Sequence, residues 1–134
     1  MNVAGELYPA VTHDLTHMRR ELAPGAASAF NDFSKMVFAD GALSPKIKNI
    51  IAVAVAHVTQ CPYCIRGHTR AALREGASNQ ELMEAIWVAA EMRAGGAFAH
   101  SIIAIDEMVK AGAVAPNDHP QHATATGEQH GHSI

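Results

Sequence analysis

The sequence predicts an all-α fold, a bundle of about six helices. Apolar side chains recur at helical spacing from Val11 to Gly112, and Pro, Gly and N-cap signals interrupt them at intervals. Aromatic residues make up only 5% of the chain and alanine is abundant, which favours close-packed helices over a sandwich or barrel. We expect one helical domain over residues 1–112 and a flexible tail over residues 113–134, since a chain of 134 residues fits one domain with its own core.

The first two predicted helices cover residues 14–22 and 26–39. Pro24 and Gly25 separate them, and Asp40-Gly41 ends the second. The second helix carries one apolar stripe at helical spacing, made of Phe30, Phe33, Met36 and Val37.

Ser44 and Pro45 mark the start of a third helix, which runs to about Gln60. Serine is a preferred N-cap residue, and proline suits the first helical position. Apolar side chains occupy most sides of this helix, which predicts that it is buried on most sides and central in the fold. They are Ile47, Ile50, Ile51, Ala52, Val53, Ala54, Val55, Ala56 and Val58.

A fourth helix is predicted to start at Pro62, with Cys61 as its N-cap and Cys64 as its third residue. It ends near Gly76, because glycine suits the left-handed position after a helix.

Residues 78–81 (SNQE) form a capping box that opens a fifth helix. Gly95-Gly96 permits a break or a close crossing, followed by a last helix over about residues 97–111. We expect three large side chains of the fifth helix in the core: Met83, Trp87 and Met92.

The only two cysteines, Cys61 and Cys64, stand three positions apart, and His68 follows one helical turn later. Thiols at this spacing can close a disulfide, and a helix N-terminus favours the reactive thiolate. His68 lies at i+4 from Cys64, where an imidazole can take the thiol proton or stabilise the thiolate. The motif therefore predicts attack on a peroxide O–O bond or on a partner disulfide, ending in a Cys61–Cys64 disulfide.

Two other interpretations of the cysteines stay open. Together with His57 and His68 they could form a Cys2His2 zinc set, although structural zinc sites usually gather ligands from two separated knuckles. The cysteines could also be inert and buried. His57 is a core histidine or a site residue, whereas spacing alone favours a structural role for His100. Glu91 and Arg93 are interpreted as a solvated or ion-paired edge.

Composition argues against several classes of partner. The formal net charge is −3 and no basic stripe is interleaved with aromatics, so no nucleic-acid binding is expected. The N-terminus does not resemble a signal peptide, and the longest uncharged stretch, residues 49–65, is too polar for a membrane span. Two cysteines are too few for a secreted disulfide scaffold, so we expect a cytoplasmic protein. Disorder, rather than metal binding, explains the tail histidines His119, His122, His130 and His132.

Residues 43–101 resemble the alkylhydroperoxidase D-like, or carboxymuconolactone decarboxylase, family. The matching stretches are LSPKIKNIIAVAVAHVTQCPYCIRGHTRAALREGAS and NQELMEAIWVAAEMRAGGAFAHS. The resemblance implies an all-α helical bundle whose central element is a helical hairpin carrying the CxxC. It also implies a homo-oligomer, commonly a trimer or a hexamer.

The family contains a decarboxylase branch, which generally does not rely on a CxxC, and a peroxidase branch, which uses both cysteines and the histidine. Cys61, Cys64 and His68 match the peroxidase branch. The resemblance therefore implies a thiol-dependent alkyl hydroperoxide reductase or disulfide reductase in antioxidant defence. Its partners would be a hydroperoxide and an external dithiol reductant, with no cofactor and no metal. Cys64 would attack the peroxide and Cys61 would resolve the sulfenic acid.

Two alternatives belong to other functional classes. One is a lyase acting on a small lactone acid, with His57 and His68 as acid–base groups. The other is a non-enzymatic oligomer that senses redox state or binds zinc.

The chain departs from the family pattern at two positions. A glutamate usually lies twelve residues before the first cysteine, but Asn49 stands there and cannot move a proton as a carboxylate does. The residue before the second cysteine, a histidine in some members, is Tyr63. We therefore expect a supporting proton relay from other side chains: His57, Tyr63, Glu91 and His100.

Overall fold

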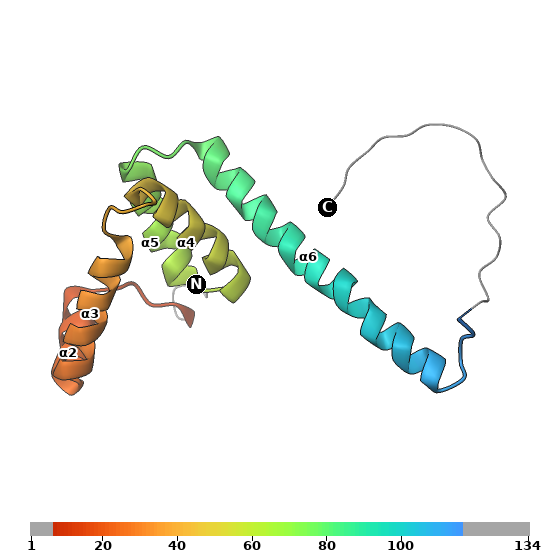
Figure 1. The fold of residues 1–134 in the computed structure, drawn as a ribbon. Helices are drawn as coiled ribbons and strands as arrows, with labels where there is room; N and C mark the ends of the chain where they lie inside the picture. Colours follow the sequence, from red (N-terminus) through yellow and green to blue (C-terminus); the bar gives the residue numbers. More distant parts are fainter. Residues whose placement is uncertain (1–6, 117–134) are drawn as a thin grey trace. The chain divides into compact units, whose positions relative to one another are not determined.

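The structure, a computed structural model, describes residues 7–116, and over this range it contains five helices and no strand (Figure 1). The chain divides into two compact units, one ending at Ala94 and the other beginning at Gly95. The expected all-α fold is confirmed, whereas the four tail histidines lie outside the described residues. The helices are α2 (His13–Leu22), α3 (Pro24–Phe38), α4 (Pro45–Thr59), α5 (Pro62–Arg74) and α6 (Asn79–Lys110).

The last helix, α6, is continuous over 32 residues. The predicted break at Gly95-Gly96 is therefore wrong, and residues 7–116 contain five helices where about six were expected for the chain. A helix-interior glycine costs only about 1 kcal/mol relative to alanine, too little by itself to interrupt a helix with good helix formers on both sides. Despite this length, no helix between residues 7 and 116 is apolar enough over a sufficient stretch to cross a membrane.

Most predicted helix ends are confirmed by their caps. The Ser44 hydroxyl accepts a hydrogen bond from the Ile47 amide at 3.3 Å, and Pro45 is the first residue of α4. The capping box before α6 is reciprocal: the Ser78 amide donates to the Glu81 carboxylate, and the Glu81 amide donates to the Ser78 hydroxyl. A further boundary differs: Pro24 is the first residue of α3 and does not lie between the two helices.

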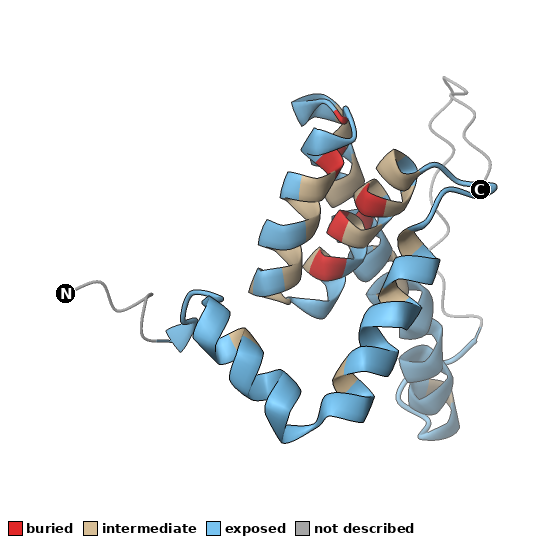
Figure 2. Ribbon diagram, turned by 90° about the vertical axis from the view of Figure 1, so that its left-hand side faces the viewer, coloured by how far each residue is buried: buried red, intermediate tan, exposed pale blue. Residues whose placement is uncertain are grey.

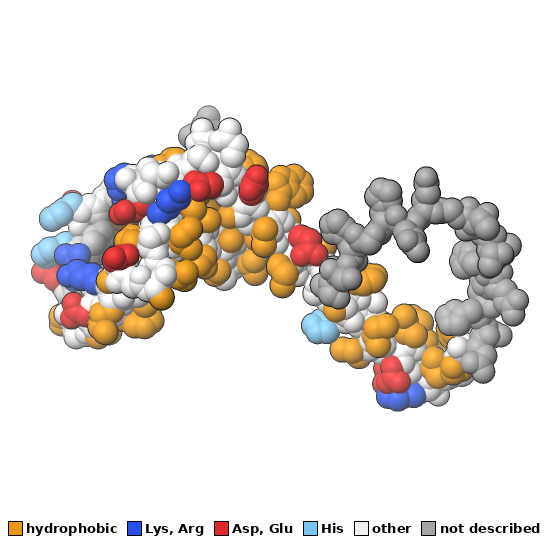
Figure 3. Space-filling view, turned by 45° about the horizontal axis from the view of Figure 1, so that its top comes forward, with side chains coloured by type: hydrophobic (Ala, Val, Ile, Leu, Met, Phe, Trp, Pro, Cys, Tyr) orange, Lys and Arg blue, Asp and Glu red, His pale blue; other side chains and the backbone are white. Residues whose placement is uncertain are grey.

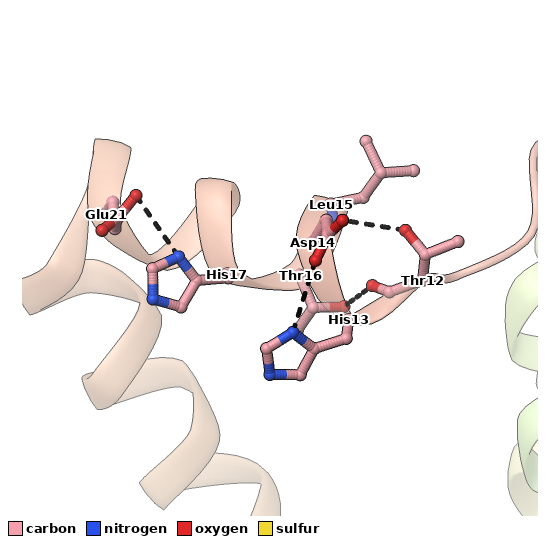
Figure 4. A network of polar contacts seen from close by, with 7 residues as sticks. All are labelled: Thr12, His13, Asp14, Leu15, Thr16, His17 and Glu21. Carbon is pink, nitrogen blue, oxygen red and sulfur yellow. Dashed lines mark hydrogen bonds and ion pairs between the residues drawn. The ribbon is translucent and has the colours of Figure 1, made fainter.

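Local polar contacts stabilise α2, the shortest helix among those of residues 7–116 (Figure 4). The Thr12 hydroxyl accepts from the Leu15 amide at 3.3 Å and caps the first turn. Further along, His17 approaches Glu21 one turn later at 3.3 Å. These contacts lie on the surface, and no residue of α2 or α3 is buried.

The core of the first unit lies where α4, α5 and the start of α6 meet (Figure 2). Tight turns join these three helices, so α4 and α5 form a helical hairpin, as the family resemblance implies. The core is small and its residues are mostly short. They are Val53, Ala72, Ala77 and Leu82, with Ile50 and Ile86 packed against them.

The expectation that α4 is buried on most sides is wrong for the single chain. Only Asn49, Val53 and Ala56 are buried, whereas Val55 is 52% exposed. The expected core residues of α6 are also exposed, Trp87 by 70%. The physical reason is that α2 and α3 contribute no buried residue, so no element between residues 7 and 116 fully covers the apolar face of α4 that includes Ile51 and Val55. Apolar side chains accordingly occupy much of the face seen in Figure 3. The exposed apolar residues include Ile47, Ile51, Val58, Met83 and Met92.

Candidate active site

A tight turn between α4 and α5 places the two cysteines at a helix start. Gln60 adopts the left-handed conformation with φ of 55°, the one positive φ at a non-glycine residue between residues 7 and 116. The amides of Gln60 and Cys61 both donate to the Ala56 carbonyl, the latter at 3.1 Å. Pro62 then begins α5. The turn thus reverses the chain within two residues and sets Cys61 beside the carboxyl end of α4.

Cys61 and Cys64 are joined by a disulfide, with their Cα atoms 5.3 Å apart. Cys61 is the N-cap of α5, and its sulfur accepts a hydrogen bond from the Cys64 amide at 3.3 Å. Both residues are half-buried. An amide N–H and the positive end of the helix both favour negative charge, so this position stabilises a Cys61 thiolate once the disulfide is reduced.

His68 is held by α4 rather than by its own helix. Its Nδ1 lies 3.0 Å from the amide oxygen of Asn49, and the Asn49 amide nitrogen donates to the Pro45 carbonyl at 2.9 Å. Asn49 is only 7% exposed, the one buried polar residue in the described part of the chain. The Phe38 ring stacks on the imidazole, with the ring centroids 4.9 Å apart. The imidazole is therefore fixed both by a hydrogen bond and by a ring face.

The predicted relay residues take separate positions. The His57 Nδ1 contacts the Val53 carbonyl at 2.7 Å, a bond within α4. The Tyr63 hydroxyl donates to the Pro9 carbonyl at 2.9 Å. Glu91 is an exposed residue of α6, and His100 is an exposed residue of the second unit. Among the residues of the first unit that the structure describes, His68 is bonded to Asn49 and not to His57 or Glu91.

The residues of the zinc interpretation are not arranged around one point as metal ligands. They are Cys61, Cys64, His57 and His68. Over residues 7–116, no three His, Cys, Asp or Glu side chains are arranged to hold a metal ion. His57 engages the Val53 carbonyl instead, and the cysteine sulfurs bond to each other.

Phe38 and Arg93 also support the site, although the sequence did not indicate this role for either residue. Phe38 lies thirty residues before His68, at the end of α3, and nothing local indicates that the two rings stack. Arg93 of α6 donates from Nη1 to the Val58 carbonyl at 3.0 Å. Because Val58 lies in the last turn of α4, this bond caps the helix end next to Cys61. Arg93 is thus a cap, where a solvated or ion-paired edge was expected.

Comparison with known proteins places much of this chain in one family. Residues 24–107 match the profile of the carboxymuconolactone decarboxylase family. One curated relative, "Uncharacterized protein 4 in cox locus" of Paracoccus denitrificans, is 68% identical over 73 residues, which cover 54% of this chain and 66% of the relative. An uncharacterised protein of Cupriavidus necator is 39% identical over 72 residues, which cover 54% of this chain and 64% of the relative. The chain thus spans slightly less than two thirds of both relatives.

Solved structures share the helical fold. A protein from Methanobacterium thermoautotrophicum is 36% identical with a TM-score of 0.59, covering 62% of this chain and 93% of that one. A carboxymuconolactone decarboxylase family protein from Legionella pneumophila is 33% identical with a TM-score of 0.55, covering 60% of this chain and 75% of that one. A Thermotoga maritima protein, 22% identical with a TM-score of 0.57 and covering 81% and 97%, shows the fold alone.

Proposed function

Because this chain belongs to the carboxymuconolactone decarboxylase family, we propose that it is a thiol-dependent oxidoreductase that reduces alkyl hydroperoxides or disulfides. The observation that carries the proposal is the Cys61–Cys64 pair in the first turn of α5, with an oriented imidazole one turn further along. Thiol-dependent reduction of a hydroperoxide or a disulfide requires a dithiol that can be oxidised to a disulfide. A neighbouring group that can carry a proton assists the reaction.

In the proposed cycle, the Cys64 thiolate attacks one oxygen of the hydroperoxide and the O–O bond breaks. The alkoxide leaves with a proton from His68 as an alcohol, and Cys64 becomes a sulfenic acid. The Cys61 thiolate then attacks the Cys64 sulfur and expels hydroxide, which leaves as water. The two thiols lose two electrons and two protons in total, and an external dithiol returns both.

We also propose that further side chains relay protons to and from the site. His57 is its first candidate, because its Nδ1 is engaged by the Val53 carbonyl and its Nε2 lies on the opposite side of the ring. Glu91, His100 and Tyr63 remain further candidates. Peroxide turnover is expected to fall in His57→Ala or in Glu91→Ala. Full turnover in both variants would remove these two residues from the relay.

We also propose that the chain acts as a homo-oligomer, a trimer or a hexamer. Support comes from the outer face of α4, where Ile51 and Val55 are about half exposed in the single chain. Large apolar patches on a protein surface usually mark an interface.

The deciding experiment measures hydroperoxide consumption with a dithiol reductant for the wild type, Cys64→Ser and the double variant Cys61→Ser/Cys64→Ser. We expect both variants to lose turnover, because neither can form the disulfide. Hydroperoxide turnover that survives in the double variant would contradict the thiol mechanism. A lactone-acid lyase activity that survives there would support the decarboxylase alternative, in which His57 and His68 act without the cysteines.

A further inference from the structure

A pocket of about 370 Å³ opens on the face of α5 that follows the disulfide. Tyr63, which lies between the two cysteines in the sequence, is one of its lining residues. Arg66 and Arg70 follow at i+3 and i+7, so they share this face of the helix. Ala10 and Val11 of the N-terminal segment also line the pocket, and the hydrogen bond from the Tyr63 hydroxyl to the Pro9 carbonyl holds this segment against α5. The lining residues are Ala10, Val11, Tyr63, Arg66, Gly67 and Arg70.

The charge of α5 is opposite to that of the whole chain. The chain has a formal net charge of −3, yet α5 holds three arginines and no acidic residue. Arg66 and Arg70 are exposed, and neither forms an ion pair with a carboxylate between residues 7 and 116. Two guanidinium groups that border one pocket favour an anion there, since arginine binds carboxylate and phosphate groups bidentately.

Gly67 lies between the two arginines in the interior of α5. An interior glycine costs a helix about 1 kcal/mol relative to alanine. A Cβ atom at this position would meet nothing within 4 Å, so no neighbour between residues 7 and 116 requires glycine. The space above Gly67 is instead part of the pocket, and a side chain would fill it.

We propose that this pocket binds the anionic group, a carboxylate or a phosphate, of a small thiol that reduces the Cys61–Cys64 disulfide. The proposal rests on the proposed redox function and names the chemistry of its reductant. The thiolate of the reductant attacks the Cys61 sulfur, and Cys64 leaves as a thiolate. A second thiol then attacks the mixed disulfide and releases Cys61. Two reductant thiols lose two electrons and become a disulfide, and the cysteines take up the two electrons and two protons.

The test compares thiols that differ only in charge. Mercaptopropionate and mercaptohexanoate are each set against the alcohol of equal length, mercaptopropanol and mercaptohexanol. The rate of disulfide loss is followed by alkylation and mass spectrometry, without peroxide. In Arg66→Gln/Arg70→Gln, we expect at least one acid to react about fivefold more slowly and the alcohols to change less than twofold. Salt should abolish the preference in the wild type.

Arg74→Gln is the matched control, because Arg74 is on the same helix but does not line the pocket. In Arg74→Gln, the ratio of the reduction rate with the acid to that with the alcohol should equal the ratio in the wild type. An equal loss for acids and alcohols in the double variant would overturn the proposal, because the arginines would then act on the cysteines and not on the ligand. No reduction by any thiol would overturn both this proposal and the redox function.

Gly67→Leu separates the pocket from the arginine charges. A Cβ atom at this position meets nothing within 4 Å, and leucine is a better helix former than glycine, so we expect an unchanged or higher melting temperature together with loss of the preference for the acids. A Gly67→Leu protein that keeps the full preference would show that the anion does not enter this pocket.

Discussion

Asn49 and His68 are joined by a hydrogen bond of 3.0 Å that links α4 to α5. The Asn49 amide nitrogen donates to the Pro45 carbonyl, so the amide oxygen is the atom that faces the imidazole. An amide oxygen only accepts, and therefore Nδ1 of His68 carries the hydrogen. In the neutral ring, Nε2 is then the nitrogen with the free lone pair. Asn49 orients the histidine from the position where the family pattern has a glutamate, and it does so without a charge.

In Asn49→Leu, the imidazole of His68 should no longer be restricted to the tautomer with its hydrogen on Nδ1. Loss of the acceptor leaves the partly buried N–H of His68 unpaired, so we expect the free energy of unfolding to fall by about 1–3 kcal/mol. Peroxide turnover should fall about tenfold, because Nε2 is no longer held as the proton carrier. Nitrogen NMR of His68 should report a mixture of tautomers in the variant. Asn31→Leu, at an exposed position of α3, is the control. An unchanged tautomer in Asn49→Leu would contradict the assignment.

The order of the cysteines can be read from the sulfenic acid. In Cys61→Ser no resolving thiol remains, so we expect dimedone to label Cys64 after one equivalent of peroxide. In Cys64→Ser we expect no label on Cys61. Tandem mass spectrometry locates the adduct. Labelling of Cys61 alone would reverse the two roles, and the Cys61 N-cap would then be the reason.

Arg93→Ala should loosen the turn before Cys61. The substitution removes the donor to the Val58 carbonyl, an exposed bond of 3.0 Å, and should cost about 1 kcal/mol of unfolding free energy. Faster amide exchange is expected in the last turn of α4 and at Cys61. Urea denaturation and hydrogen exchange measure the two effects. Arg20→Ala, at an exposed arginine of α2, should change neither.

Val55→Glu should separate the proposed oligomer. Val55 lies on the exposed apolar face of α4, and a charge placed in a covered apolar interface is costly. We expect the wild type to sediment as a trimer or hexamer and the variant as a smaller species. Ser28→Glu, at an exposed polar position of α3, should sediment like the wild type. A wild-type protein that is monomeric at micromolar concentration would contradict the oligomer.

Glu81 makes the start of α6 sensitive to acid. The hydrogen bond from Lys46, at 2.8 Å, and that from the Ser78 amide hold the pKa of the Glu81 carboxyl below its usual range. The stabilisation is therefore complete above the unfolded pKa of about 4.3 and is lost as the pH falls through the lower folded pKa. Glu81→Gln should melt at a lower temperature than wild type at neutral pH. This difference should shrink as the pH drops below about 4, and a constant difference would contradict the assignment.

The helices were largely predictable because their ends depend on residues close in sequence. The caps at Ser44, Cys61 and Ser78 each involve a partner three residues away, and all three are present. The CxxC and the histidine after it were identified for the same reason, since one helical turn sets their spacing. The break at Gly95-Gly96 failed as a prediction because glycine permits a break without requiring one.

The sequence by itself determined an all-α chain and a dithiol at the first turn of a helix. Only the tertiary structure decided what surrounds that dithiol. The partner of His68 lies nineteen residues away in Asn49, and that of Arg93 lies thirty-five residues away at Val58. Such pairs depend on how one helix is rotated and shifted against another, which no local pattern encodes. Burial depends on the same packing of helices. For this reason the apolar face of α4 and the side chain of Trp87, which the sequence predicted to be in the core, are exposed in the single chain.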